Sequence, residues 1–241
     1  SPSQKLDVNG DASIYGVRVG RGAGAVSTNT AVGASALAAN TTGAANTGIG
    51  YLANQAATIS SYSTALGWWA LKSNDGGYNT ALGAGSISSN TSGAYNTAVG
   101  SNSLASNTTA SNNTAVGYQA GYSNTTGISI TAIGYQAAYS SSTANQVTAV
   151  GSLCLTNNTA GANTATGFAA MNSNTSGGSN TAMGWYALYS NTTASNNTAI
   201  GSQAAYSNTT GTSNTALGFT ALYSATTANE NVAIGHRSLN Q

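Results

Sequence analysis

A glycine recurs at a nearly constant interval along most of the chain, and this interval constrains the fold more than any other feature. The thirteen members of the series are Gly33, Gly50, Gly67, Gly83, Gly100, Gly117, Gly134, Gly151, Gly167, Gly184, Gly201, Gly218 and Gly235. Their successive numbers differ by 17, except for a difference of 16 from Gly67 to Gly83 and from Gly151 to Gly167. A period this regular is typical of repeat proteins, in which each unit packs mainly on its two neighbours. The fold is therefore expected to be one structural unit repeated along an axis.

The composition of the unit decides between helix and strand. Each unit is similar to Asn-Thr-Ala-Val-Gly followed by a turn rich in Asn, Thr, Ser and Gly, which have low helix propensity. The unit also lacks the three- and four-residue apolar spacing of an amphipathic helix, and it is shorter than helical repeats. Short extended segments separated by Gly and Asn-Thr turns fit a coil of strands instead. We predict an all-β chain whose residues 29–241 form a parallel β-solenoid of about thirteen turns, roughly 60 Å long.

Equivalent positions of successive units form columns in such a coil. The apolar residue before each glycine and the apolar residue four positions after it are the candidate core. The Asn that opens ten of the thirteen units predicts ladders of stacked amides. Alanine stands two positions before the glycine in every unit but one, which indicates a tight contact. We predict that this column is an interface between copies of the chain, formed by Ala98, Ala115, Ala132, Ala149, Ala182 and Ala199.

Residues 1–28 lie outside the repeat. Two short apolar-polar alternations, at 6–8 and 12–14, flank Asn9-Gly10 and predict a β-hairpin. We interpret this segment as a separate cap or docking element. The sequence starts at Ser1 and stops within a unit, so we also expect a processed protein or a fragment.

Charge is nearly absent from the repeats. Only 4% of the residues are charged, none of them lies between Gly76 and Asn229, and the formal net charge is +1. Such a surface lacks the clustered Lys and Arg that bind nucleic acid phosphates or anionic lipid. No apolar run approaches the roughly 20 residues of a membrane helix. We therefore expect no nucleic acid partner and no membrane span.

Groups for catalysis and metal binding are scarce as well. Cys154 is the single cysteine and His236 the single histidine. Neither has the sequence neighbours that a nucleophilic dyad or a metal site needs. We predict that the chain is not an enzyme and holds neither a metal nor another cofactor.

Aromatic residues recur directly after the glycine and four positions later. They are candidates either for stacking between turns and chains or for contact with carbohydrate, because sugars pack on Tyr and Trp faces. The residues proposed for this role are Trp68, Trp185, Tyr122, Tyr139, Tyr189, Tyr206 and Tyr223. Sequons for N-glycosylation also recur, which predicts outward-facing loops if glycans are attached. The candidate glycosylation sites are Asn40, Asn90, Asn107, Asn124, Asn174, Asn191 and Asn208.

Two resemblances follow from these segments. "NVAIG" at 231–235 and its relatives resemble the head repeats of YadA-type trimeric autotransporter adhesins, which implies a left-handed β-roll and a homotrimer. "SPSQKLDVNGDASI" at the start, followed by "NTAVG" repeats, is similar to phage tail-fibre and virion fibre proteins. This second resemblance implies a fibre on the exterior of a virion or cell.

Three functions remain open from the sequence. The first is a structural extracellular fibre that self-assembles through the repeat stripes and the ends of the solenoid, as a homotrimer or as a filament of laterally packed or end-to-end copies. In this model the alanine column and part of the aromatic columns are buried between chains. The second is an adhesin that binds a cell-surface receptor or glycan through the tyrosine columns. The third is an ice-binding protein, because a regular column of Thr opens each strand-like segment and such columns can order water.

Overall fold

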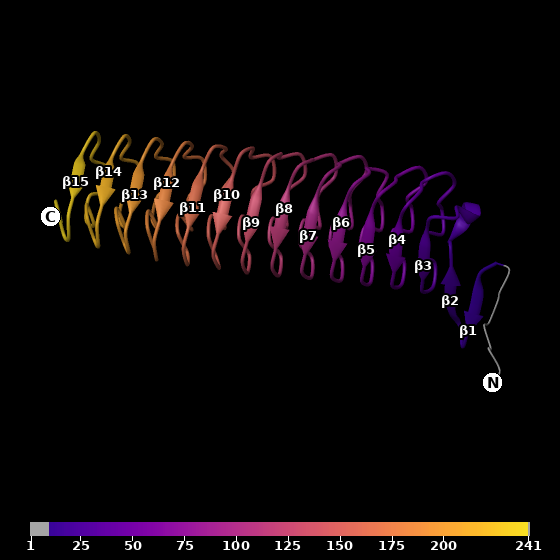
Figure 1. Ribbon diagram of the computed structural model, residues 1–241. Helices are drawn as coiled ribbons and strands as arrows, with labels where there is room; N and C mark the ends of the chain where they lie inside the picture. Colours follow the sequence, from indigo (N-terminus) through magenta and orange to yellow (C-terminus); the bar gives the residue numbers. More distant parts are fainter. Residues whose placement is uncertain (1–9, 241) are drawn as a thin grey trace.

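The computed structural model describes residues 10–240, and within this range it contains one fifteen-stranded sheet and one short 3-10 helix (Figure 1). The all-β prediction is confirmed. The elements are β1 (Ala12–Ile14), β2 (Val17–Gly20), η1 (Ala23–Ala25), β3 (Thr30–Val32), β4 (Thr47–Ile49), β5 (Thr64–Leu66), β6 (Thr80–Leu82), β7 (Thr97–Val99), β8 (Thr114–Val116), β9 (Thr131–Ile133), β10 (Thr148–Val150), β11 (Thr164–Thr166), β12 (Thr181–Met183), β13 (Thr198–Ile200), β14 (Thr215–Leu217) and β15 (Val232–Ile234).

Strands β3 to β15 form a parallel β-solenoid, which we call the coil, and this prediction is also confirmed. The sheet order follows the chain order, and equivalent residues pair in register, as in Thr114↔Thr131 and Ala115↔Ala132. The chain makes about twelve turns. The predicted number, thirteen, is the number of parallel strands from β3 to β15 and not of complete turns. Figure 1 shows these turns stacked along one axis, with β1 and β15 at opposite ends of the rod.

The interior of the coil is built from two columns of apolar side chains. One is the alanine at the centre of each strand, and the other is the residue four positions after the glycine, such as Leu104 and Leu188. The residue before the glycine was also expected in the core, and this expectation is wrong. Because side chains alternate along a strand, the inward alanine places the residues on both sides of it, such as Thr114 and Val116, on the outer face.

The second interior column has an unusual backbone. Its members have φ values between 46 and 54°, in the left-handed region that costs roughly 1–2 kcal/mol for a residue with a Cβ. They are Leu37, Leu71, Ile87, Leu104, Leu155, Met171, Leu188 and Leu222. Full burial of a large apolar side chain stabilises by about 1.5–3 kcal/mol, which offsets that cost. The left-handed turn bends the chain inward and places the side chain in the core.

The repeated glycine is required for two reasons. Gly117 has a φ of 136°, which L-residues rarely adopt, and a Cβ there would lie 2.4 Å from the carbonyl oxygen of Gly134 in the next turn. The other glycines of the series between Gly33 and Gly218 make the same close approach to the turn that follows. The glycine that recurs in the sequence therefore marks the position where the backbones of two successive turns touch.

Strands β1 and β2 form an antiparallel hairpin at the N-terminal end, which we call the cap. Strand β2 also pairs antiparallel with β3, through Val19↔Val32 and Gly20↔Ala31, and so covers the first edge of the coil. The described hairpin turns at Tyr15 and Gly16. The strand predicted at residues 6–8 lies outside the described residues.

Candidate binding surfaces

The outer face of the coil's sheet carries two columns. One is Thr in every strand from β3 to β14, and all twelve are exposed or half-buried. Within the described chain, their hydroxyl groups make no hydrogen bond, whereas the turn residues Thr108 and Thr125 donate to the carbonyl of the following turn. The other column is the apolar residue before the glycine, of which Leu82 and Met183 are 41% and 45% exposed. This face is uncharged and half apolar.

A third outer column lies two residues further along each turn, directly after the glycine. Its exposed members are Tyr51, Trp68, Tyr118, Tyr135, Phe168, Trp185 and Phe219. Together with the apolar residue before the glycine, it forms a largely apolar band along the rod, which we call the apolar stripe and which is interrupted by Ser101, Ser152 and Ser202. Exposed apolar patches of this extent usually mark an interface.

The tyrosines proposed for carbohydrate contact stack mainly on one another. Tyr206 lies between Tyr189 and Tyr223, with ring centroids 5.3 and 5.1 Å away and planes within 11° of parallel. Tyr122 and Tyr139 form a separate stacked pair at 5.2 Å. Because stacking covers the ring faces that a sugar would use, most of this column is unsuited to the predicted role. Burial, with the neighbouring phenols, raises the pKa of Tyr206.

The two tryptophans proposed with them also contact aromatic neighbours. Trp68 stacks on Trp69 at 4.1 Å, and the Nζ of Lys72 lies 4.2 Å from the Trp69 ring centroid. Trp185 meets Tyr186 edge to face at 4.3 Å. Both Trp68 and Trp185 remain about half exposed and belong to the apolar stripe.

A further ladder went unnoticed in the sequence. Tyr62, Tyr78 and Tyr95 stack with centroids 4.9 Å apart, and each is at least half exposed. They occupy the position just before the residue that opens the unit, which elsewhere holds Thr, Ala, Asn, Ser, Gln or Glu. Alignment of the units would have shown this run of three tyrosines.

The alanine column is not an interface. Its six proposed members are all 0% exposed in the single chain, because they fill the coil's own interior. These residues are Ala98, Ala115, Ala132, Ala149, Ala182 and Ala199. Their small size fits the narrow interior of their own coil, so they cannot touch a second copy.

The proposed glycosylation sites are likewise buried. Asn40, Asn90, Asn107, Asn124, Asn174, Asn191 and Asn208 are at most 1% exposed. Most of their amides join in a ladder through the coil: the Nδ2 of Asn107 donates to the Oδ1 of Asn90 at 2.9 Å, and Asn124 donates to Asn107 at 3.1 Å. Because each of these side chains is enclosed, the folded coil cannot present them to a glycosyltransferase.

The Asn that opens each unit, where the amide ladder was predicted, bonds mainly to backbone. The Oδ1 of Asn113 accepts from the N–H of Ile130 at 2.8 Å, and its Nδ2 donates to the carbonyl of Gly127 at 3.0 Å. Direct amide-to-amide bonds in this column are fewer, as between Asn96 and Asn79 at 3.1 Å. The principal ladder is therefore in the column that the sequence presented as sequons.

Cys154 and His236 lie in different environments. Desolvation by burial raises the pKa of the Cys154 thiol to about 12, which keeps it protonated and unreactive. His236 stacks on Phe219 at 5.4 Å. In residues 10–240, no group of three or more His, Cys, Asp or Glu side chains is placed to hold a metal ion.

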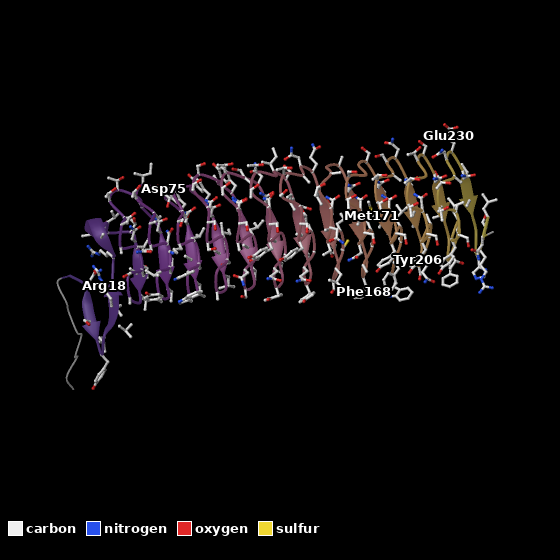
Figure 2. All side chains as sticks on the ribbon, turned by 180° about the vertical axis from the view of Figure 1, so that it is seen from behind. Arg18, Asp75, Phe168, Met171, Tyr206 and Glu230 are labelled. Carbon is white, nitrogen blue, oxygen red and sulfur yellow. The ribbon has the colours of Figure 1, made fainter. Side chains whose placement is uncertain are left out.

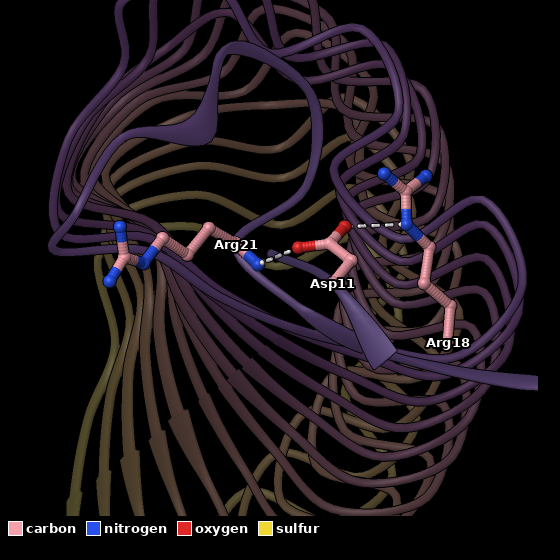
Figure 3. Close-up of polar contacts among 3 residues, drawn as sticks. All are labelled: Asp11, Arg18 and Arg21. Atoms are coloured by element: carbon pink, nitrogen blue, oxygen red, sulfur yellow. Dashed lines mark hydrogen bonds and ion pairs between the residues drawn. The ribbon is translucent and has the colours of Figure 1, made fainter. Parts of the chain in front are cut away.

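Charged side chains gather at the cap (Figure 3). The carboxylate of Asp11 accepts from the Nε of Arg18 at 2.6 Å and from the backbone N–H of Arg21 at 2.9 Å. The backbone hydrogen bond, more than the guanidinium, lowers the pKa of Asp11. Along the coil, Asp75 and Glu230 lie on the edge opposite Phe168 and Tyr206 (Figure 2).

Comparisons with protein families, with curated proteins and with solved structures gave no match for this chain. Among residues 10–240, no helix has the length and apolar character needed to cross a membrane. Function has to be inferred from the surfaces themselves.

Proposed function

We propose that the chain is the shaft of an extracellular fibre, on a virion or a cell surface, whose copies associate side by side through the apolar stripe. The observation that carries this proposal is the stripe itself, in which at least one partly exposed aliphatic or aromatic residue recurs in each turn. Burial of such surface stabilises by about 25 cal/mol per Å², so an exposed stripe of this length favours association.

A second copy of the chain is the partner that matches the stripe best. A partner must present complementary apolar groups at the same spacing of roughly 4.8 Å per turn, and an identical coil does so in register. The stripe carries no charge that would oppose such contact. Closed rotational symmetry lets every copy bury its stripe, and the resemblance to trimeric adhesins favours three copies.

Replacement of two stripe residues by charge tests the proposal. Val116→Glu combined with Ile133→Glu places carboxylates on the outer face of β8 and β9 without touching the core. We expect the wild type to sediment as an oligomer or filament and this variant as a monomer, with the same far-ultraviolet circular dichroism. Thr126→Glu with Thr143→Glu, on exposed turns away from the sheet, is the matched control and should assemble. A stripe variant that assembles like the wild type would refute the proposal.

Ice binding is a second candidate because of the threonine column. Twelve consecutive strands present an unpaired hydroxyl and a methyl at roughly 4.8 Å spacing on a parallel sheet. Lateral assembly through the neighbouring stripe would compete with ice for this face. The monomeric stripe variant should then show thermal hysteresis that Thr131→Asn with Thr148→Asn abolishes, and its absence would exclude this function.

A further inference from the structure

We propose that a hollow on the side of the last two turns binds an acidic sugar residue. The hollow has a volume of about 310 Å³ and is lined by Gln203, Phe219, Thr220, Tyr223, Arg237 and Asn240. It combines an aromatic ring, a cation and several amide or hydroxyl groups in one place. The hollow shares Phe219 with the apolar stripe, so the monomeric stripe variant is used below to separate this inference from the lateral assembly proposed above.

The hollow arises where the tyrosine ladder stops. Tyr189, Tyr206 and Tyr223 stack in successive turns, and Asn240, one full period after Tyr223, takes the next position of the column. An asparagine side chain is much shorter than a tyrosine ring. One face of Tyr223 is therefore covered by Tyr206, while its other side borders the hollow.

The position beside the ladder changes in the same turns. Gln203, Thr220 and Arg237 follow one another by one period and occupy equivalent places, so that a short Thr lies between a Gln and an Arg. Thr220 is 8% exposed, and its hydroxyl has no hydrogen-bond partner. A buried polar group without a partner is uncommon, and here it lines a hollow that can supply one.

Arg237 is free to bind an anion. Within the described chain, the one ion pair is between Arg18 and Asp11, at the other end of the rod. Glu230, the acidic residue of the last turns, lies on the edge opposite Tyr206 (Figure 2). Among the described residues, no carboxylate pairs with Arg237, which lines the hollow.

These groups match the chemistry of a pyranose that carries a carboxylate. The C–H face of the sugar packs on an aromatic ring, the guanidinium binds the carboxylate by two parallel hydrogen bonds, and amides and a hydroxyl bind the sugar hydroxyls. A neutral sugar would leave the arginine unpaired, and a small inorganic anion would leave the ring of Tyr223 unused. The ligand class is thus a uronic acid or another carboxylated monosaccharide unit.

Isothermal titration with methyl β-D-glucuronide, against methyl β-D-glucoside and inorganic phosphate, tests the proposal on the full chain. We expect the glucuronide to bind at least tenfold more tightly than either competitor. Arg237→Gln should weaken its binding at least tenfold, whereas Lys72→Gln, which removes one positive charge far away, should not. No binding of the glucuronide at millimolar concentration, or equal binding by Arg237→Gln, would overturn the proposal.

Asn240→Tyr gives an independent test because it should extend the ladder and fill the hollow. We expect this variant to lose glucuronide binding without loss of thermal stability. Tyr95→Ala, which truncates the end of a different ladder, should bind like the wild type. The monomeric stripe variant should also bind the glucuronide, so failure of this proposal and failure of lateral assembly are distinguishable. Retained binding by Asn240→Tyr would show that the ligand sits elsewhere and would refute the site.

Discussion

The cap and the coil satisfy the hydrogen bonds of their backbone and polar side chains in different ways. The cap is antiparallel, does not repeat, and is held in part by charged groups around Asp11. The coil is parallel, repeats one short unit throughout, and uses neutral amides and alanines. In the coil each side chain lies about 4.8 Å from the side chain at the equivalent position of the next turn. At this distance two like charges repel by about 1 kcal/mol even in water. Charge is therefore rare in the columns of the coil, where Lys72 and Asp75 each have neutral residues at the equivalent positions of the neighbouring turns.

The largest expected effect comes from charge placed inside the coil. Ala115→Glu would bury a carboxylate in a column that is 0% exposed, so we expect a loss of more than about 4 kcal/mol and local unfolding around β8. Val116→Glu, one residue later and on the outer face, should leave the melting midpoint nearly unchanged in the monomer. Thermal melts followed by circular dichroism measure both. Equal melting midpoints would contradict the assignment of inward and outward faces.

A smaller loss is expected where two turns touch. Gly117→Ala combines an unfavourable φ with a Cβ 2.4 Å from the carbonyl oxygen of Gly134, and we expect it to cost about 3 kcal/mol. Gly235→Ala has a similar φ of 119° but nothing within 4 Å of its Cβ, so it isolates the cost of the dihedral angle. Urea unfolding of the two variants should separate them. If both lose the same stability, the close approach between turns contributes nothing.

The amide ladder predicts a stabilising change. Ala225 stands one period after Asn208, where the ladder ends, and the buried Oδ1 of Asn208 has no partner. Ala225→Asn supplies an amide donor at this position, and we expect a gain of about 1 kcal/mol. Ser224→Asn, on an exposed neighbouring residue, is the control and should have no effect. A lower melting midpoint for Ala225→Asn would show that the ladder cannot be extended into this turn.

The smallest effect is expected in the cap. The folded pKa of Asp11 lies below its ordinary value of 3.8, so its contribution to stability is present above pH 3.8 and is lost as the pH falls through the folded pKa. Because the ion pair is exposed, this contribution is below about 1 kcal/mol. Asp11→Asn should therefore speed hydrogen exchange of the Arg21 amide at pH 6 by no more than about fivefold. Exchange that is unaffected by the substitution would exclude a role for the carboxylate.

The architecture could be predicted from the period together with the composition of the unit, because a 17-residue unit of low helix propensity leaves room for one short strand per turn. The sequence did not predict which residues of each strand face the interior. In a Thr-Ala-Val strand, either the Ala or the two residues on both sides of it can face the interior. The larger apolar side chain of Val116 favours the second arrangement. The interior is instead so narrow that only alanine fits at the strand, while the larger apolar side chains enter from left-handed positions such as Leu104.

The asparagines show the same limit on prediction. Asn107 and Asn113 both occur in Asn-Thr segments that are typical of exposed turns. The side chain of each is nevertheless buried, since each turn's carbonyl groups point into the coil and need donors there. Sequence patterns describe local turn chemistry, but they do not show on which side of the backbone the unsatisfied groups lie.

The absence of charged residues between Gly76 and Asn229 has a consequence for proteolysis. Trypsin cleaves after Lys and Arg, and between Lys72 and Arg237 the sequence offers neither. Nor does any acidic residue lie between Asp75 and Glu230 for proteases that cleave at carboxylates. Even in an unfolded chain, these enzymes would therefore leave most of the repeat region uncleaved. Resistance to these two classes of protease would come from the composition before the fold contributed anything, whereas the 13 Tyr, 3 Trp and 2 Phe leave sites for proteases that cleave at aromatic residues.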